Sequence, residues 1–283
     1  MKIFYFDLDG TLLNSEKVIT ARTMEALETW VADGNKIAIS SGRPLNSILE
    51  VIHATGLDRW SVYAIAFNGA LIYDVSNKKL LSKTALSTAD MLSIADILSG
   101  MDLYSHYYDD THILSPDASS AYFKTGQSTE AVRGELTFYT RNVHLPYHLL
   151  TDYPGISPAP SCKMLCIDLN GEKLSDAASA IEAAGEGRIR CVRSNPWYLE
   201  IFPIEAGKGA AVVALADILG IPTENTLAAG DEQNDISMIT AAGVGVAMKN
   251  GNPLAMEAAD IVTDEDNDHD GLAPIILRYS KSF

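Results

Sequence analysis

Short apolar runs recur along the chain and alternate with stretches of helical periodicity. Five of these runs have the length and composition of buried strands, at residues 2–6, 36–40, 62–66, 226–230 and 243–247. After the first run, residues 20–33 place Met24, Leu27 and Trp30 on one face of a predicted helix, which Gly34 closes. Strands that alternate with helices are typical of a doubly wound parallel sheet, so we predict a Rossmann-like α/β core.

From about residue 83 the pattern changes to that of an α+β domain. Its predicted strands lie at residues 103–108, 112–114, 163–169, 189–194 and 198–203. A helix is predicted at residues 175–184, and the proline-containing segment 146–160 is predicted to be a loop. We therefore predict a core made of residues 1–82 and 204–283, with an α+β domain at residues 83–203 inserted into it.

Two carboxylates follow the first predicted strand directly. Asp7 and Asp9 lie two residues apart, and side chains at that spacing point to the same face of an extended strand. Gly10 then allows a sharp turn. The carboxyl ends of parallel strands open onto the ligand crevice of such a sheet, so this position favours a catalytic site over an ordinary acidic turn.

The second predicted strand ends in a hydroxyl, a glycine and a guanidinium. Ser41 can donate a hydrogen bond, and Gly42 lets backbone N–H groups approach an anion closely. The pattern also fits a plain turn into a helix that begins near Pro44. Arg43 is as well suited to brace this loop through an ion pair as to contact a substrate.

Lys208 stands just before the predicted helical stretch 211–219. A cation at the start of a helix opposes the helix dipole, so this lysine is either exposed or placed there to meet an anion.

The strand at residues 226–230 runs into a further acidic loop that contains Asp231 and Asp235. If this loop meets Asp7 and Asp9, the carboxylates repel one another by roughly 4 kcal/mol per pair at ~4 Å. A bound divalent cation removes that repulsion, and oxygen ligands favour Mg²⁺.

No zinc site competes with this interpretation. Cys162 and Cys166 lie about 13 Å apart along an extended strand, which is too far to share one ion. The six histidines have no metal-ligand spacing and are expected at the surface or in loops, at positions 53, 106, 112, 144, 148 and 269.

The four segments, in this order, resemble the four motifs of the haloacid dehalogenase superfamily, in the Cof-like branch of phosphatases with a type IIB cap. They read Asp-Leu-Asp-Gly-Thr at residues 7–11, Ser-Ser-Gly-Arg-Pro at 40–44, an isolated Lys208, and Gly-Asp-Glu-Gln-Asn-Asp-Ile-Ser-Met at 230–238. Asn68 lies in a segment similar to the family's Asn-Gly-Ala. The chain departs from the family at Lys249 and Asn250, where Gly-Asn-Ala is more usual, and this leaves the roles of those two residues open.

The resemblance implies a mechanism with two roles for the first motif. Asp7 would attack phosphorus and form an aspartyl-phosphate. Asp9 would protonate the leaving oxygen and then take a proton from the hydrolytic water.

The resemblance also implies how substrate and metal are held. The phosphoryl group would contact Ser41, Gly42, Lys208 and Asn234. Mg²⁺ would be bound by the Asp7 carboxylate, the backbone carbonyl of Asp9, Asp231, and Asp235 through water. Arg43 and Asn68 would be candidate substrate contacts, and capping of a turn is the alternative role for Asn68.

Composition narrows the cellular context and the partners. The formal net charge of -16 disfavours binding to nucleic acid, and a small phosphorylated metabolite is the expected partner. No leader-like segment and no membrane-spanning apolar run is found, and three cysteines fit reduced thiols, so a cytoplasmic protein is expected. The oligomeric state is left open.

The expected function is a Mg²⁺-dependent phosphatase for small phosphomonoesters, such as sugar phosphates. A phosphomutase of the same superfamily and a non-catalytic sensor of a phosphorylated ligand are the alternatives, although a sensor does not need both Asp7 and Asp9. The cap would choose the substrate, and its candidate contacts are Tyr107, Tyr108, Lys163, Arg193 and Trp197. The aromatic residues among them are expected to pack within the cap, and the charged residues are expected to lie on solvated strand faces.

Overall fold

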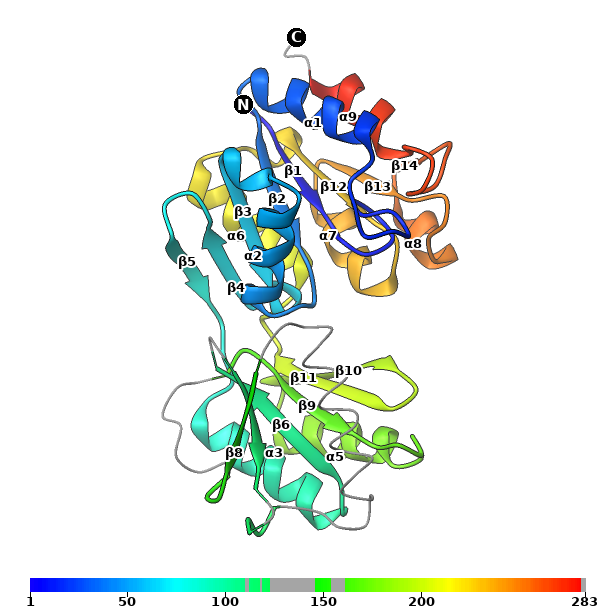
Figure 1. Cartoon of the computed structure of the whole chain (residues 1–283). Helices are drawn as coiled ribbons and strands as arrows, with labels where there is room; N and C mark the ends of the chain where they lie inside the picture. The colour runs from blue at the N-terminus through cyan, green and yellow to red at the C-terminus, as the bar shows by residue number, and fades with distance from the viewer. Residues whose placement is uncertain (110–111, 118, 123–145, 154–160, 281–283) are drawn as a thin grey trace. The chain divides into compact units, whose positions relative to one another are not determined.

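The computed structural model describes residues 1–109, 112–117, 119–122, 146–153 and 161–280. The chain divides into two compact units (Figure 1). The core unit contains Met1–Ser82 and Gly207–Phe283, and the inserted unit contains Lys83–Ala206.

In the described part of the core unit, one sheet joins eight strands in the order β14-β13-β12-β1-β2-β3-β4-β5. Their bounds are β1 Ile3–Phe6, β2 Lys36–Ser40, β3 Val62–Ala66, β4 Leu71–Asp74, β5 Lys79–Lys83, β12 Thr226–Gly230, β13 Val244–Ala247 and β14 Ile261–Val262. The strands from β14 to β3 pair in parallel, whereas β4 returns antiparallel to β3. The five apolar runs predicted as strands are β1, β2, β3, β12 and β13.

Helices cover both faces of this sheet (Figure 1). They are α1 Ala21–Ala32, α2 Leu45–Ala54, α6 Lys208–Leu219, α7 Ile236–Ala241, α8 Pro253–Ala258 and α9 Leu272–Ser280. On one face, Tyr5 packs with Val212 and Leu215 of α6. On the other, Phe4 makes an edge contact with Trp30 of α1, at 5.6 Å between ring centroids. The predicted doubly wound α/β fold is therefore confirmed.

The inserted unit has one sheet in its described part, with six strands in the order β10-β11-β9-β6-β7-β8. The bounds are β6 Tyr104–Tyr108, β7 Ile113–Pro116, β8 Tyr147–Leu150, β9 Met164–Ile167, β10 Ile189–Asn195 and β11 Tyr198–Pro203. Helices α3 Thr88–Gly100 and α5 Leu174–Ala184 pack on one face of it. The predicted loop at 146–160 was wrong for residues 147–150, which form β8, and its residues 154–160 lie outside the described residues.

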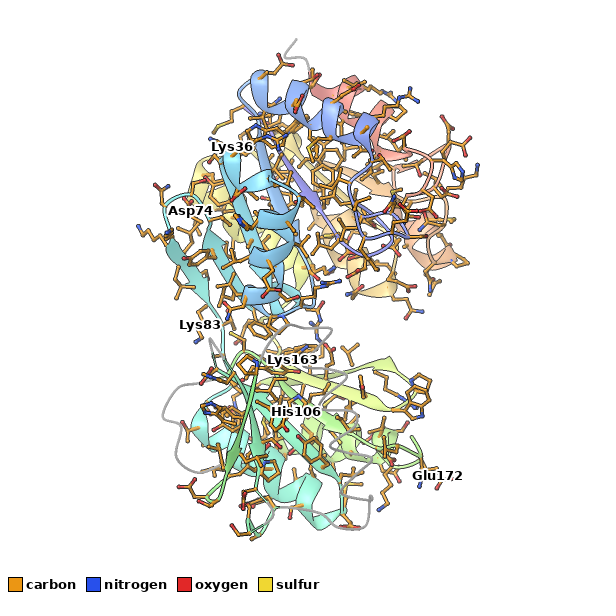
Figure 2. All side chains as sticks on the ribbon, in the orientation of Figure 1. Lys36, Asp74, Lys83, His106, Lys163 and Glu172 are labelled. Atoms are coloured by element: carbon orange, nitrogen blue, oxygen red, sulfur yellow. The ribbon has the colours of Figure 1, made fainter. Side chains whose placement is uncertain are left out.

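Two polar side chains of the inserted unit, both labelled in Figure 2, are buried, contrary to expectation. His106 is fully buried in β6, where its ring bonds to the hydroxyls of Tyr104 and Tyr108, so it is not a surface histidine. Lys163 is 1 % exposed and lies 3.4 Å from Glu200, so it does not belong to a solvated strand face. Burial, with the nearby charge of Lys163, lowers the pKa of His106 to about 3 and keeps its ring neutral.

The described helices are all too short or too polar to cross a lipid bilayer.

Candidate active site

The candidate site residues of the core unit are brought together by the register of adjacent parallel strands. Phe6 at the end of β1 is level with Ile39 in β2 and with Ala229 in β12. The Asp7 N–H continues this ladder by donating to the Ala229 carbonyl at 2.9 Å. The loops after β1, β2 and β12 therefore leave the sheet at the same edge, where α/β proteins bind their ligands.

A buried lysine joins two of these loops. Lys208 is the first residue of α6, and it is 1 % exposed. Its ammonium donates to Oδ1 of Asp7 at 2.6 Å and to Oδ1 of Asp235 at 2.5 Å. The sequence allowed Lys208 to be either exposed or placed to meet an anion. Its burial excludes the first explanation, and its ammonium lies among carboxylates.

Hydrogen bonds hold the carboxylates of Asp235 and Asp231 in place. The donors lie in their own loop and in the first motif. Oδ2 of Asp235 accepts hydrogen bonds from the backbone N–H groups of Asp231 and Glu232, both at 3.0 Å. Oδ1 of Asp231 accepts from the hydroxyl of Thr11 at 2.7 Å. A Cβ at Gly10 would lie 2.4 Å from Oδ2 of Asp231, so only glycine fits beside this carboxylate.

The electrostatics of this cluster favour an added cation. Burial raises the pKa of Asp7, Lys208 opposes the rise, and the charges of Asp235 and Asp231 add to it. Burial likewise raises the pKa of Asp231 to about 6, against the hydrogen bond from Thr11 and with the charge of Asp235. One lysine therefore does not fully compensate three clustered carboxyl groups.

A divalent metal fits this donor set. Asp7, Asp231 and Asp235 each offer a carboxylate oxygen, and these three atoms all lie within 4.8 Å of one another. All three residues are buried, and every side-chain donor is a hard oxygen, as Mg²⁺ requires.

Asp9 does not join the cluster through its side chain. The Arg43 guanidinium forks onto its carboxylate, with Nε 2.9 Å from Oδ2 and Nη2 2.8 Å from Oδ1. Lys17 adds a contact to Oδ1 at 2.7 Å. Burial alone would raise the pKa of Asp9, but the Lys17 hydrogen bond and the charge and hydrogen bonds of Arg43 outweigh it and lower the pKa. Arg43 is thus an ion-pair partner of Asp9 in this structure.

The remaining predicted residues form a second group. Ser41 is buried, and its hydroxyl accepts from the Arg43 N–H at 3.3 Å. Asn68 accepts from the side chain of Asn234 at 3.1 Å through its Oδ1. A Cβ at Gly42 would lie 3.1 Å from that same Oδ1, so Gly42 and Asn68 are in close contact.

A model of the haloacid dehalogenase-like hydrolase family matches residues 4–276. The chain belongs to this family. It is 32% identical to 5-amino-6-(5-phospho-D-ribitylamino)uracil phosphatase YwtE of Bacillus subtilis, over 98% of this chain and 97% of the relative. It is 28% identical to phosphatase YwpJ of Bacillus subtilis, over 95% and 96% of the two chains. The predicted family and the predicted enzyme class, a phosphatase of this family, are confirmed.

Solved structures of family members have the same fold. A haloacid dehalogenase-like hydrolase from Bacteroides thetaiotaomicron superposes with a TM-score of 0.83 at 27% identity, over 98% of both chains. The subclass IIB sugar phosphatase BT4131 superposes with a TM-score of 0.78 at 24% identity, over 99% of both chains. The second likeness concerns the fold alone.

Some contacts in and around the site could not be predicted from the sequence. Thr11 belongs to the first motif, but no spacing in the sequence assigns its hydrogen bond to Asp231. No pattern points to Lys17, which lies in a polar turn. Asn250 donates from Nδ2 to the Gly10 carbonyl at 2.8 Å and thereby braces the first motif, whereas Lys249 forms an exposed pair with Glu265 at 3.0 Å.

Proposed function

We propose that the protein is a Mg²⁺-dependent phosphatase that hydrolyses small phosphomonoesters, such as sugar phosphates, through an aspartyl-phosphate. The observation that carries this proposal is the buried Asp7, held by Lys208 and grouped with Asp231 and Asp235 at the ligand-binding edge of a parallel sheet. We also propose that the inserted unit is the cap domain and that the remainder is the catalytic domain.

Asp7 is the proposed nucleophile. Its carboxylate oxygen attacks phosphorus, the bond from phosphorus to the leaving oxygen breaks, and the phosphoryl group is transferred to Asp7. Lys208, at 2.6 Å from Oδ1, orients this carboxylate and supports its charged form. Its ammonium is also the buried cation best placed to neutralise phosphoryl oxygens, as phosphoryl transfer requires.

Asp9 is the proposed acid and base. It gives a proton to the leaving oxygen in the first step and takes one from water in the second, when that water attacks the phosphorus of the aspartyl-phosphate and releases orthophosphate. The contacts of Arg43 and Lys17 stabilise the ionised form of this carboxylate, whereas the first step needs its protonated form. We therefore propose that Asp9 exchanges at least one of these contacts when substrate binds.

The phosphoryl oxygens are proposed to contact Ser41, the backbone at Gly42, Lys208 and Asn234. The metal would be held by Asp7, Asp231 and the backbone carbonyl of Asp9, with Asp235 acting through water. Bound there, Mg²⁺ supplies charge neutralisation for the phosphoryl group and for the clustered carboxylates.

Turnover of p-nitrophenyl phosphate is expected with Mg²⁺ and is expected to be lost with EDTA. The physical reason is that three buried carboxylates near the phosphoryl site repel a phosphate dianion unless a cation neutralises them. Release of p-nitrophenolate is measured with each addition and after Mg²⁺ is restored. Metal-independent turnover, or none under any condition, would refute the proposal. A panel of sugar phosphates and other phosphorylated metabolites then ranks substrates by kcat/KM.

Asp9→Asn is expected to convert p-nitrophenyl phosphate turnover into a burst followed by a slow steady state. Nitrophenolate leaves with little help from an acid, so the first step persists, whereas hydrolysis of the aspartyl-phosphate lacks its base and slows by about 10²–10³-fold. Stopped-flow absorbance measures a burst amplitude that approaches one product per enzyme. A wild-type rate in this variant would remove Asp9 from the chemistry.

A further inference from the structure

Three successive residues after β3 have left-handed backbone conformations. The φ angles are 51° at Phe67, 54° at Asn68 and 98° at Gly69. Glycine adopts such angles freely and asparagine tolerates them, but a bulky phenylalanine rarely does. A turn of this kind persists only where its surroundings hold it, and such turns cluster at functional sites.

The backbone of this turn is bonded to the loop after β2. The Phe67 N–H donates to the Arg43 carbonyl, and the Asn68 N–H donates to the Ser41 carbonyl, each at 3.0 Å. The turn therefore fixes both ends of the Ser-Gly-Arg segment, and the carboxamide of Asn68 lies against Gly42 between them.

The same turn is packed against the chain that leads into α6. A Cβ built on Gly69 would lie 2.2 Å from the carbonyl oxygen of Gly207 and 2.9 Å from the backbone nitrogen of Lys208. The main chains thus approach so closely that only glycine fits. This contact sets the position from which the Lys208 side chain reaches Asp7.

The side chain of Asn68 completes the connection to the acidic loop, because its Oδ1 accepts the hydrogen bond from Asn234 at 3.1 Å. Residues 67–69 therefore contact the second, third and fourth motif loops at once.

We propose that the 67–69 turn is a positioning element of the active site, and that Asn68 is a positioning residue that acts through Asn234 and the Ser41–Gly42 loop. Its task is to hold at fixed spacing the loops that carry the proposed phosphoryl contacts. This inference rests on the proposed function for those loops. It gives Asn68 a role without contact to the substrate.

The variant Asn68→Gly tests the role of the carboxamide separately from that of the backbone conformation. Glycine accepts a φ of 54° without strain, so the variant keeps the turn and loses only the side-chain contacts. Lys78→Gly is the matched control, because Lys78 is exposed and has a φ of 50° in the turn between β4 and β5. That turn follows Asp74 (Figure 2), which pairs with Tyr63 near the start of β3. Asn68 follows the end of β3, so the two turns lie at opposite ends of that strand.

Both glycine variants are expected to melt no lower than the wild type. Only Asn68→Gly is expected to lose function, with kcat/KM for p-nitrophenyl phosphate lower by about tenfold to a hundredfold. The inhibition constant of inorganic phosphate is expected to rise by about tenfold, because misplaced loops bind the anion less well. That constant does not depend on the fraction of folded enzyme, so a merely structural role would leave it unchanged.

A double-mutant cycle with Asn234→Ala tests the route of the effect. If Asn68 acts through Asn234, Asn68→Gly costs clearly less in the Asn234→Ala background than in the wild type. Fully multiplicative losses would instead mean that Asn68 does not act through Asn234, and would overturn that part of the proposal. An unchanged phosphate inhibition constant, or a drop in melting temperature that accounts for the lost activity, would overturn the positioning role itself. Failure of the proposed function is distinct, because the wild type itself would then show no Mg²⁺-dependent turnover.

Discussion

Asp7→Asn is expected to reduce the turnover of p-nitrophenyl phosphate by a factor on the order of 10⁴ or more, while the protein stays folded. A carboxamide oxygen is a very weak nucleophile, so the covalent step is lost even though binding and the other charges of the site remain. Steady-state rates in Mg²⁺ measure the loss. Circular dichroism and thermal melting measure the fold.

The structure explains why folding should survive this change. Asparagine has the shape of aspartate, and its carboxamide oxygen can still accept the hydrogen bond from Lys208, which also keeps its partner Asp235. The substitution removes one of three clustered carboxyl groups, so repulsion within the site falls.

The control for Asp7→Asn is Asp33→Asn, at an exposed position that follows α1. It is expected to keep full activity. Acid quenching after incubation with labelled substrate should trap phosphate on the wild type and on Asp33→Asn, but not on Asp7→Asn. Residual turnover above about one per cent in Asp7→Asn, with a normal melt, would exclude Asp7 as the nucleophile.

The parallel core could be predicted because its strands are buried on both sides. Such strands are continuous apolar runs, and β2, β3 and β12 begin and end at the predicted residues. The strand β8 carries no such signal, since Tyr147 and Leu149 are 37% and 48% exposed, and its pairing with β7 is supplied by residues far away in the sequence. The burial of Lys163 could not be predicted for a related reason, because its ion-pair partner Glu200 lies far away in the sequence, in β11.

Within the candidate site, spacing could predict which loops meet but not which side chains bond. The position of Lys208 before a helix left an exposed and a buried explanation open, and only the fold brings its ammonium to Asp7 and Asp235. Arg43 likewise had two explanations, and the fork onto Asp9 follows from the distance between two loops. The 67–69 turn could be recognised as a motif, but its contacts to three loops depend on backbone angles that the sequence does not specify.

Lys208→Met is expected to abolish activity and, unlike Asp7→Asn, to destabilise the protein. Removal of this ammonium leaves the carboxyl groups of Asp7 and Asp235 buried without their cation. Breaking a buried pair in this way costs about 3–5 kcal/mol, because the remaining charges have lost their water and gained nothing in exchange. In EDTA, the melting temperature is therefore expected to fall by several degrees.

The same charge balance predicts that Mg²⁺ stabilises Lys208→Met more than it stabilises the wild type. With the lysine gone, the metal becomes the main compensating charge for Asp7, Asp231 and Asp235, so its binding relieves a larger repulsion. Thermal melts with Mg²⁺ and with EDTA measure the two increments. Lys249→Met is the matched control, because its pair with Glu265 is exposed and contributes little. Equal increments in the wild type and Lys208→Met would mean that the lysine and the metal do not share the same carboxylates, and the proposed metal site would have to be sought elsewhere.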